Sequence, residues 1–163
     1  MRPTFAALAI FLSLAPLASV AQQQVAFGGL KTDTKLPVEV TADSLSVNQT
    51  DGTATFTGNV LIVQGEMRLK AAQVDVAYGK TDKSKIDTLH ATGGVTLVSA
   101  TEAAESKVAD YDVTAGKVVM TGDVLLTQGK NVMAGQKLTV DLTSGTGQMD
   151  GRVRTVLQPE TKK

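Results

Sequence analysis

The sequence predicts an all-β protein, an elongated antiparallel β-jellyroll built from repeated two-strand units. Two observations support this fold class: a tandem repeat with a Thr-Gly-x-Val core, and a period-two alternation of apolar and polar residues within each copy. Turn-forming residues between the apolar runs provide a third, because short strands with closely spaced turns are typical of sandwiches and barrels.

The repeat is clearest between residues 47–76 and 111–140, which align without a gap at an offset of 64 residues. Weaker copies lie between and after these segments, so that the Thr-Gly-x-Val motif and its variants recur along the chain. Their glycines are Gly58, Gly93, Gly122 and Gly151. A glycine inside a strand marks a bend or a close backbone approach. We therefore expect each strand to turn there from one sheet to another.

Alternation assigns one apolar face to the strands of every copy. The positions on this face are Ala54, Phe56, Val60, Ile62, Met67, Leu69, Ala71, Val74, Val76, Tyr78, Leu89, Ala91, Val95, Leu97, Val118, Met120, Val124, Leu126, Met133, Leu138 and Val140. Turns are expected at Asp51-Gly52, Gln64-Gly65, Tyr78-Gly79-Lys80, Ala115-Gly116, Gln128-Gly129 and Ser144-Gly145. Residues 101–109 fit the pattern less well and are expected to be strand or loop.

The first 21 residues have the pattern of a secretory signal. A single charged residue, Arg2, precedes an apolar run, and Ser19-Val20-Ala21 provides small residues for cleavage after Ala21. The alternative is a membrane anchor, but Pro16 interrupts the run. We expect an exported protein with a flexible lead-in at 22–35, a β-jellyroll domain at 36–158 and a short polar tail at 159–163.

Composition excludes several classes of function. The 163 residues include 16 Lys+Arg and 16 Asp+Glu, so the chain lacks the basic excess of a nucleic-acid binder. It has no Cys and one His, which excludes disulfides, cysteine catalysis and a His-based metal cluster within one chain. Aromatic residues make up only 4%, so we expect an aliphatic core.

No catalytic constellation is evident. Gly79-Lys80-Thr81 lacks the earlier glycine of a phosphate-binding loop, because that position is Val74. His90 falls on the polar phase of its strand, where we expect it to face solvent without a catalytic partner. The aspartates are scattered beside turns, and no spacing brings two carboxylates together. We therefore predict a protein that is not an enzyme and that needs no cofactor or metal.

The apolar face has two interpretations. Its residues can close on one another as the core of an ordinary small β-sandwich, or they can line a groove that stays open for an apolar ligand. Small branched side chains fit both alternatives, so the pattern alone does not decide between them.

Two segments carry a resemblance to a known family. Val38-Glu39-Val40-Thr41-Ala42-Asp43 leads to Phe56-Thr57-Gly58-Asn59-Val60, and Ala109-Asp110-Tyr111-Asp112 leads to Met120-Thr121-Gly122-Asp123-Val124. With the export signal, these motifs resemble the OstA-like β-jellyroll family of lipopolysaccharide-transport proteins, over about residues 36–157. Among its members the soluble bridge protein of the periplasm fits best. The resemblance departs at Gly93-Gly94, where Gly-Asn is usual.

The resemblance implies a twisted, V-shaped jellyroll whose interior holds the acyl chains of lipid A, the lipid part of lipopolysaccharide. The lipid-binding residues would be Val38, Val40, Phe56, Val60, Ile62, Leu69, Val76, Leu97, Met120, Val124 and Leu126. It also implies partner jellyrolls at the inner and outer membranes and head-to-tail self-association through edge strands. The residues of these edges would be Val38, Val40, Val153 and Leu157. The alternative function is a structural or adhesin-like β-repeat that binds other proteins or glycans.

Overall fold

The computed structural model describes residues 24–26, 29–80, 82 and 84–158. Within these residues the regular secondary structure consists of β-strands alone. The strands form one eleven-stranded, antiparallel sheet, which confirms the predicted all-β class. Their bounds are β1 Gln24–Ala26, β2 Glu39–Thr41, β3 Ser44–Asn48, β4 Thr53–Gln64, β5 Met67–Tyr78, β6 Ile86–Ser99, β7 Glu102–Asp112, β8 Lys117–Gln128, β9 Asn131–Asp141, β10 Thr146–Asp150 and β11 Arg154–Val156.

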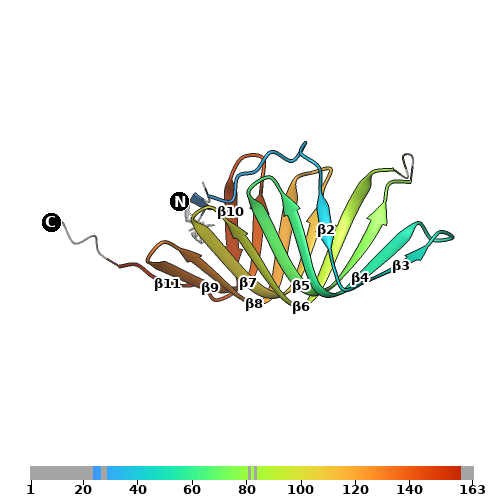
Figure 1. Cartoon of the computed structure of the whole chain (residues 1–163). Coiled ribbons are helices and arrows are strands. Elements are labelled where there is room, and N and C mark those ends of the chain that lie inside the picture. The colour runs from blue at the N-terminus through green and yellow to red at the C-terminus, as the bar shows by residue number, and fades with distance from the viewer. Residues whose placement is uncertain (1–23, 27–28, 81, 83, 159–163) are drawn as a thin grey trace, which may run out of the picture.

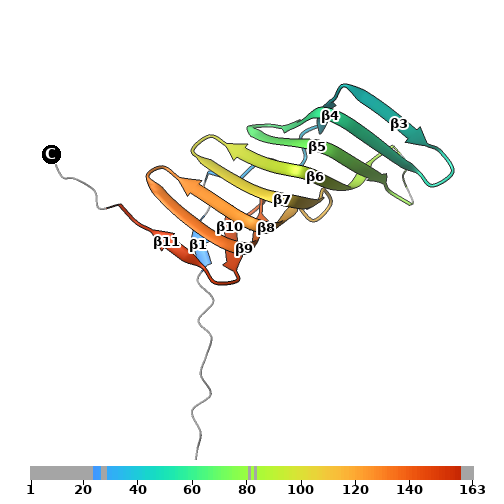
Figure 2. The same cartoon turned by 90° about the horizontal axis from the view of Figure 1, so that it is seen from below.

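The sheet is bent along a line that crosses its long strands, so that it forms the two walls of a V (Figure 1). The first wall contains β2, residues 60–64, 67–71, 95–99, 102–106, 124–128 and 131–135, and β11. The second wall contains β3, residues 53–57, 73–78, 86–92, 108–112, 117–121 and 137–141, then β10 and β1. Seen from below, the strands follow one another from β3 to β11 along the length of the molecule (Figure 2).

The bend is made by the repeat glycines. Backbone pairs with positive φ occur at Gly58-Asn59, Gly93-Gly94, Gly122-Asp123 and Gly151-Arg152. The strand pairings within β4–β9 shift register at this level, as expected of β-bulges. This confirms the turn at the mid-strand glycines of β4, β6 and β8, whereas Gly151 lies between β10 and β11, and β5, β7 and β9 cross the bend without a residue of positive φ. Five of the six expected turns also have a glycine with positive φ, at Gly52, Gly65, Gly116, Gly129 and Gly145, whereas Gly79 is not among the glycines with positive φ.

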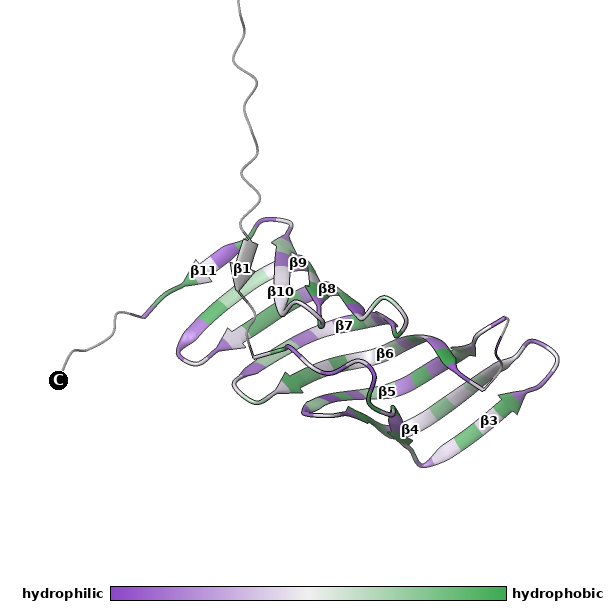
Figure 3. Cartoon of the chain, turned by 90° about the horizontal axis from the view of Figure 1, so that it is seen from above, coloured by the Kyte–Doolittle hydropathy of each residue, from purple (hydrophilic) through white to green (hydrophobic). Residues whose placement is uncertain are grey.

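The apolar face of the strands points into the V, where its residues share one core. Figure 3 shows hydrophobic and hydrophilic residues alternating along the strands. Side chains from both walls belong to one continuous hydrophobic core, and Leu69, Leu97, Leu126 and Leu138 are each at most 1% exposed. The outer face of the second wall is polar, with His90 and Asp110 exposed on neighbouring strands. The alternation read from the sequence therefore identifies the inner face correctly.

Residues 101–109, expected to be strand or loop, fall in β7 and at its start, so the strand alternative is correct. The expected signal peptide at 1–21 and the expected polar tail at 159–163 lie outside the described residues. In the part of the chain that is described, we find no helix with the length and hydropathy needed to cross a membrane.

Candidate functional site

The predicted lipid-binding residues come together on the inner face of the two walls. Three of them, Val38, Val40 and Phe56, are half-buried and pack against the core. The others are fully buried, each no more than 1% exposed: Val60, Ile62, Leu69, Val76, Leu97, Met120, Val124 and Leu126. The structure thus unites them in one apolar interior, while their binding of lipid stays a prediction.

This interior is packed in the structure. Side chains of the two walls bury each other, and Leu30, from the N-terminal segment, is also fully buried in the same core. Of the two interpretations of the apolar face, the closed core describes this state. An acyl chain would have to separate the walls in order to enter, since such a core is close-packed.

The interior is open at the end formed by β3. Leu45 and Val47 pair with Phe56 and Ala54 and therefore share the inner face, yet they are 55% and 58% exposed. A hollow of about 360 Å³ lies beside Val47, and Val47 and Tyr78 contribute to its lining. Apolar surface of the interior therefore reaches solvent at this end of the molecule.

The N-terminal segment crosses the mouth of the V, above the core (Figures 1 and 3). We call residues 29–36 the strap. The backbone N–H of Thr32 donates to the carbonyl of Leu142 at 3.0 Å, and its hydroxyl donates to the carbonyl of Gln64 at 3.1 Å. Leu142 follows the second wall and Gln64 ends β4 in the first, so Thr32 joins the two walls. The mobility expected of the lead-in stays a prediction, but this part of it has a defined place.

A buried polar pair also joins the walls beneath the strap. The hydroxyl of Tyr111, in the second wall, donates to Oε1 of Gln64 at 2.5 Å, and both residues are at most 1% exposed. The Gln64 side chain in turn donates through Nε2 to the carbonyls of Thr34 at 3.0 Å and Leu36 at 2.9 Å. Gln64, which belongs to the first wall, therefore has partners in the strap and in the second wall. No sequence pattern indicates this role, because Gln64-Gly65 has the pattern of an ordinary turn.

Burial of Tyr111 changes its ionisation. Burial raises the pKa of this phenol from 10.0 to about 12, more than the hydrogen bond to Gln64 lowers it. The pKa of Tyr111 is higher in the folded chain than in the unfolded chain. The stability that the buried neutral phenol contributes is therefore fully present below pH 10 and is lost as pH rises toward 12.

The chain has two tyrosines. In Tyr78→Phe, the ultraviolet absorbance of tyrosinate should therefore rise near pH 12 when folded and near pH 10 in urea. A folded midpoint near 10 would contradict this environment.

A second polar group lies under the strap in the first wall. Oε1 of Glu102, a side chain only 5% exposed, accepts hydrogen bonds from the Gly29 N–H at 3.3 Å and from Nε2 of Gln128 at 2.6 Å. Oε2 of Glu102 and Oγ of Ser99 are buried without a hydrogen-bond partner among the described residues. The strap therefore closes over polar groups at the rim and over apolar groups below it.

The predicted partner edges lie at opposite ends of the first wall. Val38 precedes β2 and Val40 lies within it, whereas Val153 and Leu157 flank β11. Leu157 is 70% exposed. Both edge strands pair on one side only in the described chain, β2 with β4 and β11 with β9. Pairing with another molecule through them stays a prediction.

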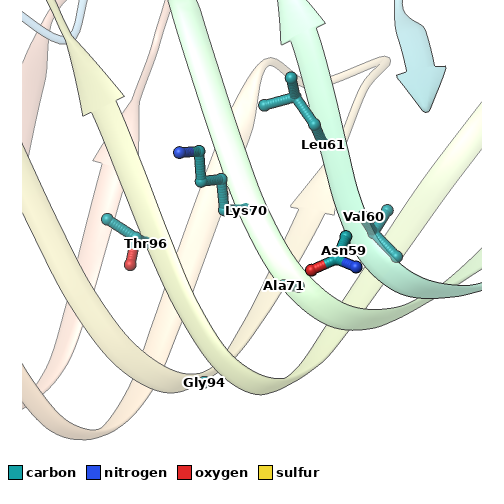
Figure 4. Close-up of a pocket in the computed structure, with 7 residues that line it drawn as sticks. All are labelled: Asn59, Val60, Leu61, Lys70, Ala71, Gly94 and Thr96. Carbon is teal, nitrogen blue, oxygen red and sulfur yellow. The ribbon is translucent and has the colours of Figure 1, made fainter. Parts of the chain in front are cut away.

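Two surface features of the described residues lie outside the apolar interior. A depression of about 390 Å³ lies at the bend, where Lys70, Leu61 and Thr96 contribute side chains from the outer face (Figure 4). His90, expected to face solvent without a partner, is exposed, but its Nδ1 lies 2.5 Å from Oδ1 of Asp110 across the β6–β7 pairing. Within the described residues, no three His, Asp or Glu side chains are grouped as a metal site.

The bent sheet and its continuous apolar interior define a class of protein, the two-walled β-jellyroll with an aliphatic core. A family model described as "LptA/(LptD N-terminal domain) LPS transport protein" matches residues 39–146, which is well over half of the chain. The chain belongs to this family of LPS transport proteins, as the sequence motifs predicted. It is therefore a member of a transport family rather than an enzyme.

Two relatives and one solved structure are similar to this chain. The chain is 31% identical over 145 residues to an uncharacterised protein of Rhizobium meliloti (strain 1021), with 83% of this chain and 78% of that protein covered. It is 28% identical over 141 residues to the lipopolysaccharide export system protein LptA of Haemophilus influenzae, with 80% and 81% covered. The crystal structure of LptH, the LptA homologue from Pseudomonas aeruginosa, matches with a TM-score of 0.70 at 21% identity, covering 78% of this chain and 99% of LptH. This match supports the jellyroll fold.

Proposed function

We propose that this protein is a periplasmic carrier that holds the acyl chains of lipopolysaccharide between its two walls. In this proposal it passes the lipid from a jellyroll partner at the inner membrane to one at the outer membrane, through a head-to-tail bridge. The observation that carries the proposal is the apolar interior, which continues across β4–β9 and reaches solvent beside Leu45 and Val47. Family membership and the LptA relative support the same substrate class.

The physical need for such an interior is large. Exposing an acyl chain to water costs about 0.8 kcal/mol per methylene, or about 10 kcal/mol for a chain of a dozen carbons. A lining of Val, Leu, Ile and Met side chains removes this cost without fixing the lipid at one place, since apolar contact is non-directional. The sugars and phosphates would remain in solvent.

Loading requires the walls to part, because the interior is packed in the absence of lipid. The strap and the Gln64–Tyr111 pair close the mouth, whereas the end at β3 is already open. We therefore infer that an acyl chain first contacts Leu45, Val47 and Phe56 and then moves inward toward Leu97.

Photo-crosslinking tests this proposal. A photoreactive phenylalanine analogue at Phe56, which is on the inner face, is expected to form a covalent adduct with lipopolysaccharide when the protein is loaded. The same probe at Thr57 provides a matched control, since Thr57 is the next residue of β4 and is exposed on the outer face. Mass spectrometry would identify the adduct. The absence of an adduct at Phe56, or equal adducts at both positions, would contradict binding in the interior.

A further inference from the structure

The two walls differ at their ends. The first wall ends at β2 on one side and at β11 on the other, and neither has a second strand partner in the described chain. The second wall ends at β3 on one side, but on the other side β1 pairs with β10. Residues Gln24–Ala26 thus cover residues 146–148 of β10, at an edge that would otherwise be available for another strand.

β1 runs across the sheet in the same direction as β3. β2 and β3 follow one another along one edge of the bent sheet, and β10 and β11 follow one another along the opposite edge. β4–β9 lie between these edges and every neighbouring pair is antiparallel, so the two edges run in opposite directions. A second copy joined end to end by translation would therefore place its β3 antiparallel to β10, as β1 already lies.

The register of this pairing follows from the repeat. Within the chain, the N–H of Asp43 donates to the carbonyl of Gly58 at 2.9 Å, and β3 pairs with the residues before Gly58. Gly151 is the repeat equivalent of Gly58 and has nearly the same φ, 82° against 83°. If Asp43 of a second copy lies opposite Gly151, then its residues 46–48 lie opposite residues 148–146. These are the residues that β1 covers.

We propose that β1 is an internal substitute for β3 of a second copy, and that end-to-end joining through the second wall requires β1 to leave β10. Val25 pairs with Gly147, at the register position that Val47 of the second copy would take. This inference rests on the head-to-tail assembly in the proposed function, and it adds that β1 regulates this assembly. Because the strap tethers β1 to the same chain, β1 competes at high effective concentration with β3 of a second copy for pairing with β10. The second copy must therefore displace β1 with its longer edge, formed by β2 and β3.

Weakening β1 should strengthen self-association. In the full chain after export, Val25→Pro removes a backbone N–H and disfavours strand pairing, and we expect the dissociation constant for self-association to fall at least tenfold. Val25→Thr is the matched control, since it stays β-branched and should associate like the natural chain. Sedimentation velocity over a concentration series measures the constant, and far-UV circular dichroism checks the fold.

Locking β1 should have the opposite effect. The chain has no cysteine, so Ala26→Cys with Thr146→Cys introduces one pair at positions that oppose each other between β1 and β10. The oxidised protein is expected to associate at least tenfold more weakly than the same protein after reduction.

The outcomes separate the two proposals. Equal association of the natural chain, Val25→Pro and the locked protein would overturn the role of β1 and leave head-to-tail assembly intact. If none of these proteins self-associates at any concentration, the role of β1 and the head-to-tail bridge both fail. Lipid crosslinking at Phe56 is independent of both results.

Discussion

Replacing Gly93 by alanine is expected to destabilise the protein much more than replacing its neighbour Gly94. Both glycines have positive φ, 82° and 87°, so alanine is strained at either position by about 1–2 kcal/mol. A Cβ at Gly93 would also lie 2.5 Å from the Cβ of Ala72 on β5, whereas a Cβ at Gly94 meets nothing within 4 Å. The contact at Gly93 adds a further cost, because neither Cβ can rotate away and the backbones of the two neighbouring strands must shift to relieve it.

Urea unfolding of the two variants measures this difference, and a third variant tests its cause. Ala72→Gly in the Gly93→Ala background removes the opposing methyl group and should restore part of the lost stability. The same Ala72→Gly change in the Gly94→Ala background should give no such recovery. Equal unfolding midpoints for Gly93→Ala and Gly94→Ala would mean that the strands do not approach each other closely along the bend.

Substitution of Gln64 by leucine is expected to release the strap. Leucine fills a similar volume but removes the hydrogen bonds to the carbonyls of Thr34 and Leu36 and the acceptor of the Tyr111 hydroxyl. A buried polar group that loses its partner costs about 1–3 kcal/mol, and the Tyr111 hydroxyl has no access to solvent. Local opening of the strap should then become frequent, and trypsin should cleave faster at Lys31 and Lys35.

A double-mutant cycle with Tyr111→Phe separates the contributions. Phenylalanine removes the stranded hydroxyl, so Gln64→Leu/Tyr111→Phe should be more stable than Gln64→Leu alone. Cleavage at Lys31 and Lys35 should remain fast in the double variant, because the strap carbonyls still lack Gln64. If trypsin cleaves Gln64→Leu at the rate of the natural chain, the strap does not depend on this side chain.

The fold was largely predictable from local patterns. Alternation identifies the inner face because a pleated strand alternates its side chains strictly, and the repeat glycines identify the bend because few other residues adopt positive φ. Gly58 and Gly122 show both signals in one motif. Residues 101–109 were harder to assign, since Glu102 and Ser106 are polar residues on the buried face of β7 and interrupt its apolar pattern.

The closure of the mouth was not predictable in the same way. The strap is polar and has no period, so nothing in its sequence indicates that Leu30 is buried or that Thr32 joins two walls. Gln64 is recognisable only from the partners that the fold brings to it, which lie 28 to 47 residues away in the chain. The state of the interior also depends on tertiary packing, because the same aliphatic residues suit a closed core and an open groove.

The row of glycine-centred bends allows the two walls to pivot about one line. A small torsional change repeated along that line alters the angle between the walls while the hydrogen bonds within each wall stay intact. If the protein carries lipid as proposed, the space between the walls can then widen for cargo of different bulk once the strap and the Gln64–Tyr111 pair have released the mouth. Discrimination by the number or length of fatty tails should accordingly be weak.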